Sequence, residues 1–72
     1  MDYKETLKKL IARQDLTERE SADAVGEILG GAMSPVRIAG FLAALAAKGE
    51  TVDEIAGAAR AMRAAATRVQ SL

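Results

Sequence analysis

The sequence contains no cysteine, no histidine and no tryptophan, and it has a single proline, phenylalanine and tyrosine in 72 residues. The lack of cysteine excludes a disulfide framework and a thiolate metal site, and the lack of histidine removes the commonest general base. Ten basic and ten acidic residues cancel, so no net charge attracts nucleic acid or an anionic membrane. No apolar run approaches the ~18 residues of a membrane span, and the charged N-terminus does not resemble a signal peptide. We expect a cytoplasmic protein without nucleic-acid or membrane partners.

Large apolar side chains are also scarce. Half of the residues are apolar, but many of these are alanine. A chain of this length buries about 60% of the surface that its unfolded form exposes, and alanine adds little to a core. The sequence therefore predicts one domain, residues 1–72, with a thin hydrophobic core. Such a domain is expected to lean on a second copy of itself or on another part of a longer polypeptide.

The spacing of apolar residues predicts an all-α fold, a compact bundle of four short helices. These helices are expected at about residues 2–13, 17–30, 35–48 and 52–68. The inward stripes are expected to be Tyr3, Leu7, Leu10 and Ile11 in the first helix, Ala22, Val25, Ile28 and Leu29 in the second, and Val52, Ile55, Ala59, Met62, Ala66 and Val69 in the fourth.

The helix boundaries have clear sequence signals. Thr17 with Glu20, and Thr51 with Glu54, form two capping boxes, in which each side chain can bond the backbone amide of the other residue. Gly49 is expected to end the third helix in the left-handed conformation, which costs glycine nothing. The remaining signals are Gly30-Gly31 at the end of the second helix and Ser34-Pro35 at the start of the third.

The third helix is apolar on nearly every side. Arg37 and Lys48 are the charged residues within 35–48, and a helix of this kind is normally buried on more than one side. Three other short helices cannot easily surround it, so we expect it to contact something outside the chain. The candidate dimer or interdomain interface comprises Leu7, Ile11, Val36, Ala39, Gly40 and Ala43.

Polar groups that could carry chemistry have simpler explanations. The carboxylates at 18–23 and 50–54 lie at helix starts, where they complement the helix dipole, so a metal or acid–base site is the less favoured reading. Gly30-Gly31 lacks the strand and the Lys-Ser/Thr pair of a phosphate loop. The arginines at 60, 63 and 68 could bind an anion, but a solvated helix face explains them. A helix-turn-helix DNA reader is disfavoured because the third helix is so apolar.

Several motifs together resemble a known family. They are Asp15-Leu16-Thr17-Glu18, Ile28-Leu29-Gly30, Ser34-Pro35, the run from Ile38 to Leu45, Lys48-Gly49-Glu50-Thr51, and the run from Asp53 to Arg63. From Leu7 to Arg63 the chain resembles the N-terminal helical domain of the anthranilate phosphoribosyltransferase and nucleoside phosphorylase superfamily. Glu50 favours the transferase branch, because pyrimidine nucleoside phosphorylases usually have methionine at this position.

The resemblance implies a domain of a tryptophan-biosynthesis enzyme that transfers the phosphoribosyl group of phosphoribosyl diphosphate to anthranilate, using Mg²⁺. In that family the helical domain carries the homodimer interface and packs beside a larger α/β catalytic domain, with substrates in the cleft between them. The family's diphosphate loop and magnesium ligands would lie beyond Leu72. The catalytic domain is thus expected to be absent, and this chain to hold no catalytic, substrate-binding or metal-binding residue, to need no cofactor and to be inactive alone. The alternatives are the equivalent domain of a pyrimidine nucleoside phosphorylase and a stand-alone helical adaptor that binds a protein.

Overall fold

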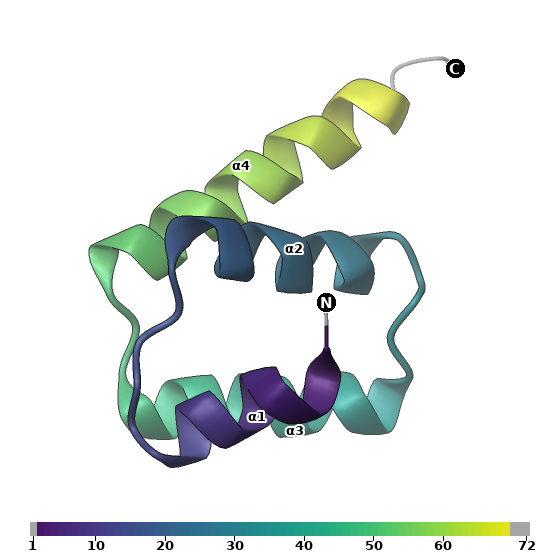
Figure 1. Cartoon of the computed structure of the whole chain (residues 1–72). Coiled ribbons are helices and arrows are strands. Elements are labelled where there is room, and N and C mark those ends of the chain that lie inside the picture. The colour runs from purple at the N-terminus through teal and green to yellow at the C-terminus, as the bar shows by residue number, and fades with distance from the viewer. Residues whose placement is uncertain (1, 70–72) are drawn as a thin grey trace.

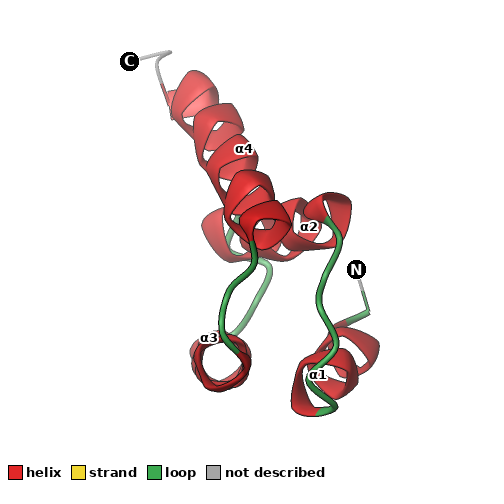
Figure 2. Ribbon diagram, turned by 90° about the vertical axis from the view of Figure 1, so that its left-hand side faces the viewer, coloured by secondary structure: helices red, strands yellow, loops and turns green. Residues whose placement is uncertain are grey.

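Two pairs of helices form two layers. The computed structural model describes residues 2–69, with the side chains of 67–69 left out. Within this range the helices are α1 (Tyr3–Ile11), α2 (Glu18–Leu29), α3 (Pro35–Lys48) and α4 (Val52–Val69). α1 lies beside α3 in one layer, and α2 packs against α4 in the other (Figures 1 and 2). The predicted all-α bundle of four helices is confirmed.

The predicted helix starts are confirmed by hydrogen bonds. The Thr17 hydroxyl accepts the Glu20 amide at 3.1 Å, and the Glu20 carboxylate accepts the Thr17 amide at 2.9 Å. The same pair of bonds joins Thr51 and Glu54, at 3.2 and 2.9 Å. At the start of α3, the Ser34 hydroxyl accepts the amide of the third helical residue at 3.3 Å. Each cap satisfies a backbone donor that the helix itself leaves unpaired.

The end of α1 differs from the prediction. The helix stops at Ile11 instead of residue 13 because Arg13 adopts a positive φ of 61°. The Gln14 amide then donates to the Lys9 carbonyl at 2.8 Å and the Arg13 amide to the Leu10 carbonyl at 3.0 Å, which is the bonding of a Schellman cap. Glycine is the usual residue at this position, so an arginine there gave no sequence signal.

The glycines at the other helix ends also refine the prediction. At the end of α2, Gly31 has the positive φ of 79°, while Gly30 stays in the right-handed region. Gly49 has a φ of 92° and a ψ of 132°, so the expectation of a left-handed helical conformation was wrong. The positive φ still favours glycine, but the extended ψ turns the chain directly towards α4.

The core lies between the two layers and is small, as expected. Its buried apolar side chains are Leu10, Leu16, Ala24, Met33 and Phe41. Two of these, Leu16 and Met33, come from connections between helices. Loops therefore supply part of the core that the helices, rich in alanine, do not fill.

The predicted stripe of α4 was wrong. Val52, Ile55 and Met62 are exposed, and the side chain of Val69 lies outside the described residues. The buried face of α4 is instead formed by Glu54, Gly57 and Ala61. Small residues let the two backbones approach closely, and the resulting contact decides which face is covered. The stripe of α2 was partly wrong for the same reason, since Ser21 and Ala24 are its buried residues and Leu29 is exposed.

Candidate interaction surface and buried ion cluster

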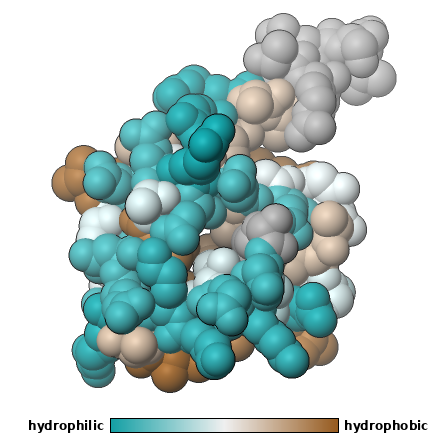
Figure 3. All heavy atoms as spheres, viewed as in Figure 1, coloured by the Kyte–Doolittle hydropathy of each residue, from teal (hydrophilic) through white to brown (hydrophobic). Residues whose placement is uncertain are grey.

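The outer surface of the α1/α3 layer is apolar and open. Val36 is 82% exposed and Ile11 is 70% exposed, while Leu7 is half-buried. On α3 the exposed residues follow a helical spacing on the side opposite Phe41. We define the α1/α3 outer face as Leu7, Ile11, Val36, Ala39, Ala43 and Ala47. Figure 3 shows apolar atoms along the lower edge of the molecule, at this layer.

One predicted interface residue lies between α1 and α3 of the same chain. A β-carbon at Gly40 would come within 2.8 Å of the Tyr3 hydroxyl. That hydroxyl donates to the Arg37 carbonyl at 2.9 Å, and the Arg37 guanidinium lies 4.9 Å from the centre of the Tyr3 ring. Gly40 is half-buried as a result. It serves the contact that holds the two helices of the layer together, whereas the other five predicted residues face outwards or border the outer face.

A second apolar surface lies between three helices. It is a groove of about 340 Å³ that opens between α2, α3 and α4. The large apolar side chains that line it are Val25, Phe41, Leu42, Leu45, Ile55 and Met62. Sequence reasoning assigned Ile55 and Met62 to the core and did not find this groove. No signal in the sequence distinguishes a groove-lining residue from a core residue, because both belong to apolar stripes.

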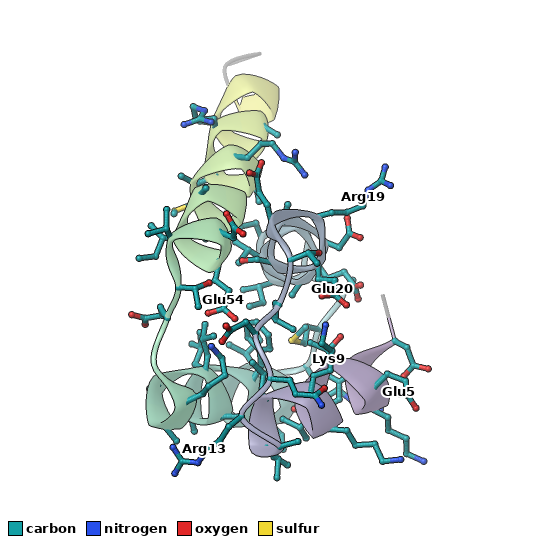
Figure 4. The ribbon with its side chains drawn as sticks, turned by 60° about the vertical axis from the view of Figure 1, so that its left-hand side comes forward. Glu5, Lys9, Arg13, Arg19, Glu20 and Glu54 are labelled. Carbon is teal, nitrogen blue, oxygen red and sulfur yellow. The ribbon has the colours of Figure 1, made fainter. Side chains whose placement is uncertain are left out.

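A cluster of charged and polar groups lies where two connections meet, with Glu54 and Lys48 at its buried end and Asp15 at its exposed end. Glu54 accepts the Leu16 amide at 2.7 Å, the Thr51 amide at 2.9 Å and the Lys48 ammonium at 3.0 Å. The Lys48 ammonium also donates to Asp15 at 3.0 Å. The side chains of Glu54 and Lys48 are only 1% and 3% exposed. We call these five residues the Glu54 cluster, and Figure 4 shows Glu54 pointing into the space between the layers.

The Glu54 cluster stays charged because its hydrogen bonds outweigh burial. Burial alone would raise the pKa of Glu54, but the bonds from Leu16, Lys48 and Thr51 hold it below the usual value. Burial alone would likewise lower the pKa of Lys48, yet the carboxylates of Asp15 and Glu54 raise it. The sequence predicted the capping role of Glu54. It gave no sign of the bond to Leu16, which joins residues 38 positions apart.

The capping box of Thr17 and Glu20 carries a more exposed ion pair. Lys9 donates to Glu20 at 2.8 Å, and these side chains are 32% and 40% exposed. The Lys9 bond, followed by the Thr17 amide, lowers the pKa of Glu20. Figure 4 shows Lys9 reaching from α1 towards Glu20 on α2. The two boxes thus have the same chemistry in different environments, which makes Glu20 a matched control for Glu54.

Among residues 2–69, no group of three metal-ligating side chains lies close enough to hold an ion. Arg60 pairs with Glu18 at 3.2 Å on the surface, and the side chain of Arg68 lies outside the described residues. Within the same range, no helix has the length and apolar character needed to cross a bilayer.

Comparison with known proteins identifies the family. Residues 4–66 match the family model described as "Glycosyl transferase family, helical bundle domain". The chain belongs to this family. It is 50% identical over 68 residues to the anthranilate phosphoribosyltransferase of Desulfatibacillum aliphaticivorans, covering 94% of this chain and 20% of that protein. For the protein of the same name from Methylobacillus flagellatus, identity is 50% over 70 residues, covering 97% and 20%.

The match covers nearly all of this chain but only a small part of each relative. A third anthranilate phosphoribosyltransferase, from Cellvibrio japonicus, is 49% identical over 69 residues, which is 96% of this chain and 20% of that protein. The chain therefore spans about a fifth of the length of the curated relatives that it matches. The four helices of this glycosyl transferase family domain, with both apolar surfaces and the Glu54 cluster, lie almost wholly within the matched region.

Proposed function

We propose that the chain is the N-terminal helical domain of an anthranilate phosphoribosyltransferase of the cytoplasm. This enzyme of tryptophan biosynthesis transfers the phosphoribosyl group of phosphoribosyl diphosphate to anthranilate. The observation that carries the proposal is the identity of about half of all residues over nearly the whole chain with proteins of that name. The magnesium ion of the reaction belongs to the rest of the enzyme in this proposal, and the isolated domain has no transferase activity.

The two apolar surfaces supply the contacts that such a domain needs. We assign the α1/α3 outer face to a second copy of the chain and the α2/α3/α4 groove to the catalytic domain. The outer face is built of small, exposed residues such as Ala39 and Ala43 around Val36, so two copies could approach closely. The groove is lined by larger side chains, which suits an inserted apolar segment. Both surfaces support the idea that the domain works as a connector.

A domain exchange tests the proposed function. In the enzyme of Desulfatibacillum aliphaticivorans, the 68 matched residues are replaced by those of this chain. We expect the chimera to consume anthranilate in the presence of phosphoribosyl diphosphate and Mg²⁺, because the contacts between domains are retained. The same enzyme without these residues is the negative control and should be inactive. A chimera that is folded, as judged by circular dichroism, and yet inactive would contradict the assignment.

A further inference from the structure

The contact between α2 and α4 is close and is made largely by small side chains. A β-carbon at Gly57 would collide with the Glu18 carbonyl and lie 2.9 Å from the Ala22 amide nitrogen. One turn further on, Ala61 is the next buried residue of α4. This contact selects the small-residue face of α4, but uniform small side chains do not strongly fix the direction in which the helix crosses α2. Apolar packing alone therefore leaves the direction of α4 weakly specified.

Directional bonds at the beginning of α4 supply this specification. The Glu54 carboxylate bonds the Leu16 amide of the α1–α2 connection and the Lys48 ammonium at the end of α3. The Glu54 carbonyl accepts the Ser21 hydroxyl of α2 at 2.6 Å. One residue of α4 is thus bonded to the other layer, to a loop and to its neighbouring helix. These three bonds tie the start of α4 to α2, to α3 and to the α1–α2 connection.

The burial of the Glu54–Lys48 pair points to specificity rather than to stability. Removing two charges from water is costly, and a buried ion pair often gives no more stability than apolar side chains of similar size. The best-attested use of such a pair is to select one packing arrangement among several. By comparison, the Arg60–Glu18 pair further along α4 is half-exposed, and pairs of this kind contribute little.

We propose that the Glu54 cluster sets the direction of α4 relative to the α1/α3 layer. Without the cluster, α4 stays helical and in contact with α2 but occupies more than one orientation. The later turns of α4 diverge from α2 (Figure 1), so a small rotation at Glu54 becomes a large displacement at the far end. The inference concerns this chain alone and does not depend on the transferase assignment. If that assignment holds, the cluster also orients the catalytic domain.

Spin-label distances between α3 and α4 test the proposal. The chain has no cysteine, so labels can be placed at Ala46→Cys and Ala64→Cys, which are exposed positions. Labelled chain is diluted with unlabelled chain to suppress distances between copies. The test variant is Lys48→Met with Glu54→Gln, which removes both charges but keeps a residue that capping boxes accept. We expect one narrow distance distribution in the parent and a broad or double one in the variant.

A matched variant and a fallback keep the test decisive. Lys9→Met with Glu20→Gln removes the exposed pair of the other capping box and should leave the distribution narrow. If the test variant loses its helical circular dichroism, Glu54→Gln alone replaces it, since Lys48 keeps its bonds to Asp15 and to the Gly49 carbonyl. A folded variant with a distribution as narrow as that of the parent would overturn the proposal. Equal broadening in the Lys9 and Glu20 variant would also overturn it, because burial would then not matter.

Discussion

At the residue scale, Glu54 and Glu20 show how environment changes the role of one side chain. Both close a capping box and both bind a lysine. Glu54 is buried and also holds the Leu16 amide, whereas Glu20 is partly exposed. The capping boxes could be predicted because they depend on residues three positions apart. The Leu16 bond could not, since it depends on how the layers assemble.

We predict that Glu54 makes the chain sensitive to acid. Its pKa is lowered in the folded state, so its stabilising effect is complete above the unfolded value of about 4.3 and is lost as the pH falls through the folded pKa. At pH 7, Glu54→Gln should reduce the free energy of unfolding by about 1–3 kcal/mol. The two carboxylate oxygens of Glu54 accept the Leu16 and Thr51 amides, and the single side-chain oxygen of glutamine cannot replace both. Urea unfolding followed by circular dichroism at pH 7 and pH 3 measures the free energy of unfolding of the parent and of the variant at each pH.

The measurement at pH 3 and a second variant provide the controls. The difference between the parent and Glu54→Gln should shrink towards pH 3, because protonation removes the same charge in the parent. Glu20→Gln, which affects an exposed pair, should cost less than about 1 kcal/mol at pH 7. A difference for Glu54→Gln that is unchanged at pH 3 would mean that the carboxylate charge is not what stabilises the cluster.

At the element scale, helix existence was easier to predict than helix orientation. Local caps determine where α2, α3 and α4 begin, and all three starts were found. The buried face of α4 was missed because alanine and glycine cover several faces of this helix, and a weak apolar period does not choose among them. The choice depends on where another backbone can approach, which is a property of the pair α2 and α4 and not of α4 alone.

Two glycines inside helices should therefore respond in opposite ways to the same substitution. At Gly57 a β-carbon would meet the backbone of α2, so Gly57→Ala should destabilise the chain by about 1–3 kcal/mol. At Gly26 a β-carbon would meet nothing within 4 Å, so Gly26→Ala should stabilise it by about 0.5–1 kcal/mol through helix propensity. Thermal unfolding followed by circular dichroism shows whether each substitution lowers or raises the stability of the chain. If both substitutions stabilise the chain, the close contact between α2 and α4 is not present in solution.

At the scale of the whole molecule, the thin core and the apolar surface have one cause. The chain has enough apolar residues for a larger core, but many of them are alanines of α3 that lie on its exposed side, opposite Phe41. Composition alone predicted this excess, and the structure locates it on the α1/α3 outer face and in the α2/α3/α4 groove. Which partner covers which surface depends on molecules outside this chain, so the sequence could not assign them.

Self-association of the chain separates the two assignments. If the α1/α3 outer face meets a second copy, the parent should form dimers at high concentration, and Ala39→Glu should shift the equilibrium to monomer because it buries an unpaired charge at the contact. Ala64→Glu places the same charge on an exposed position of α4 and should leave the dimer intact. Sedimentation equilibrium measures both, and circular dichroism confirms that the variants are folded. If Ala39→Glu leaves the dimer intact, the second copy does not bind on the α1/α3 outer face and that assignment is wrong.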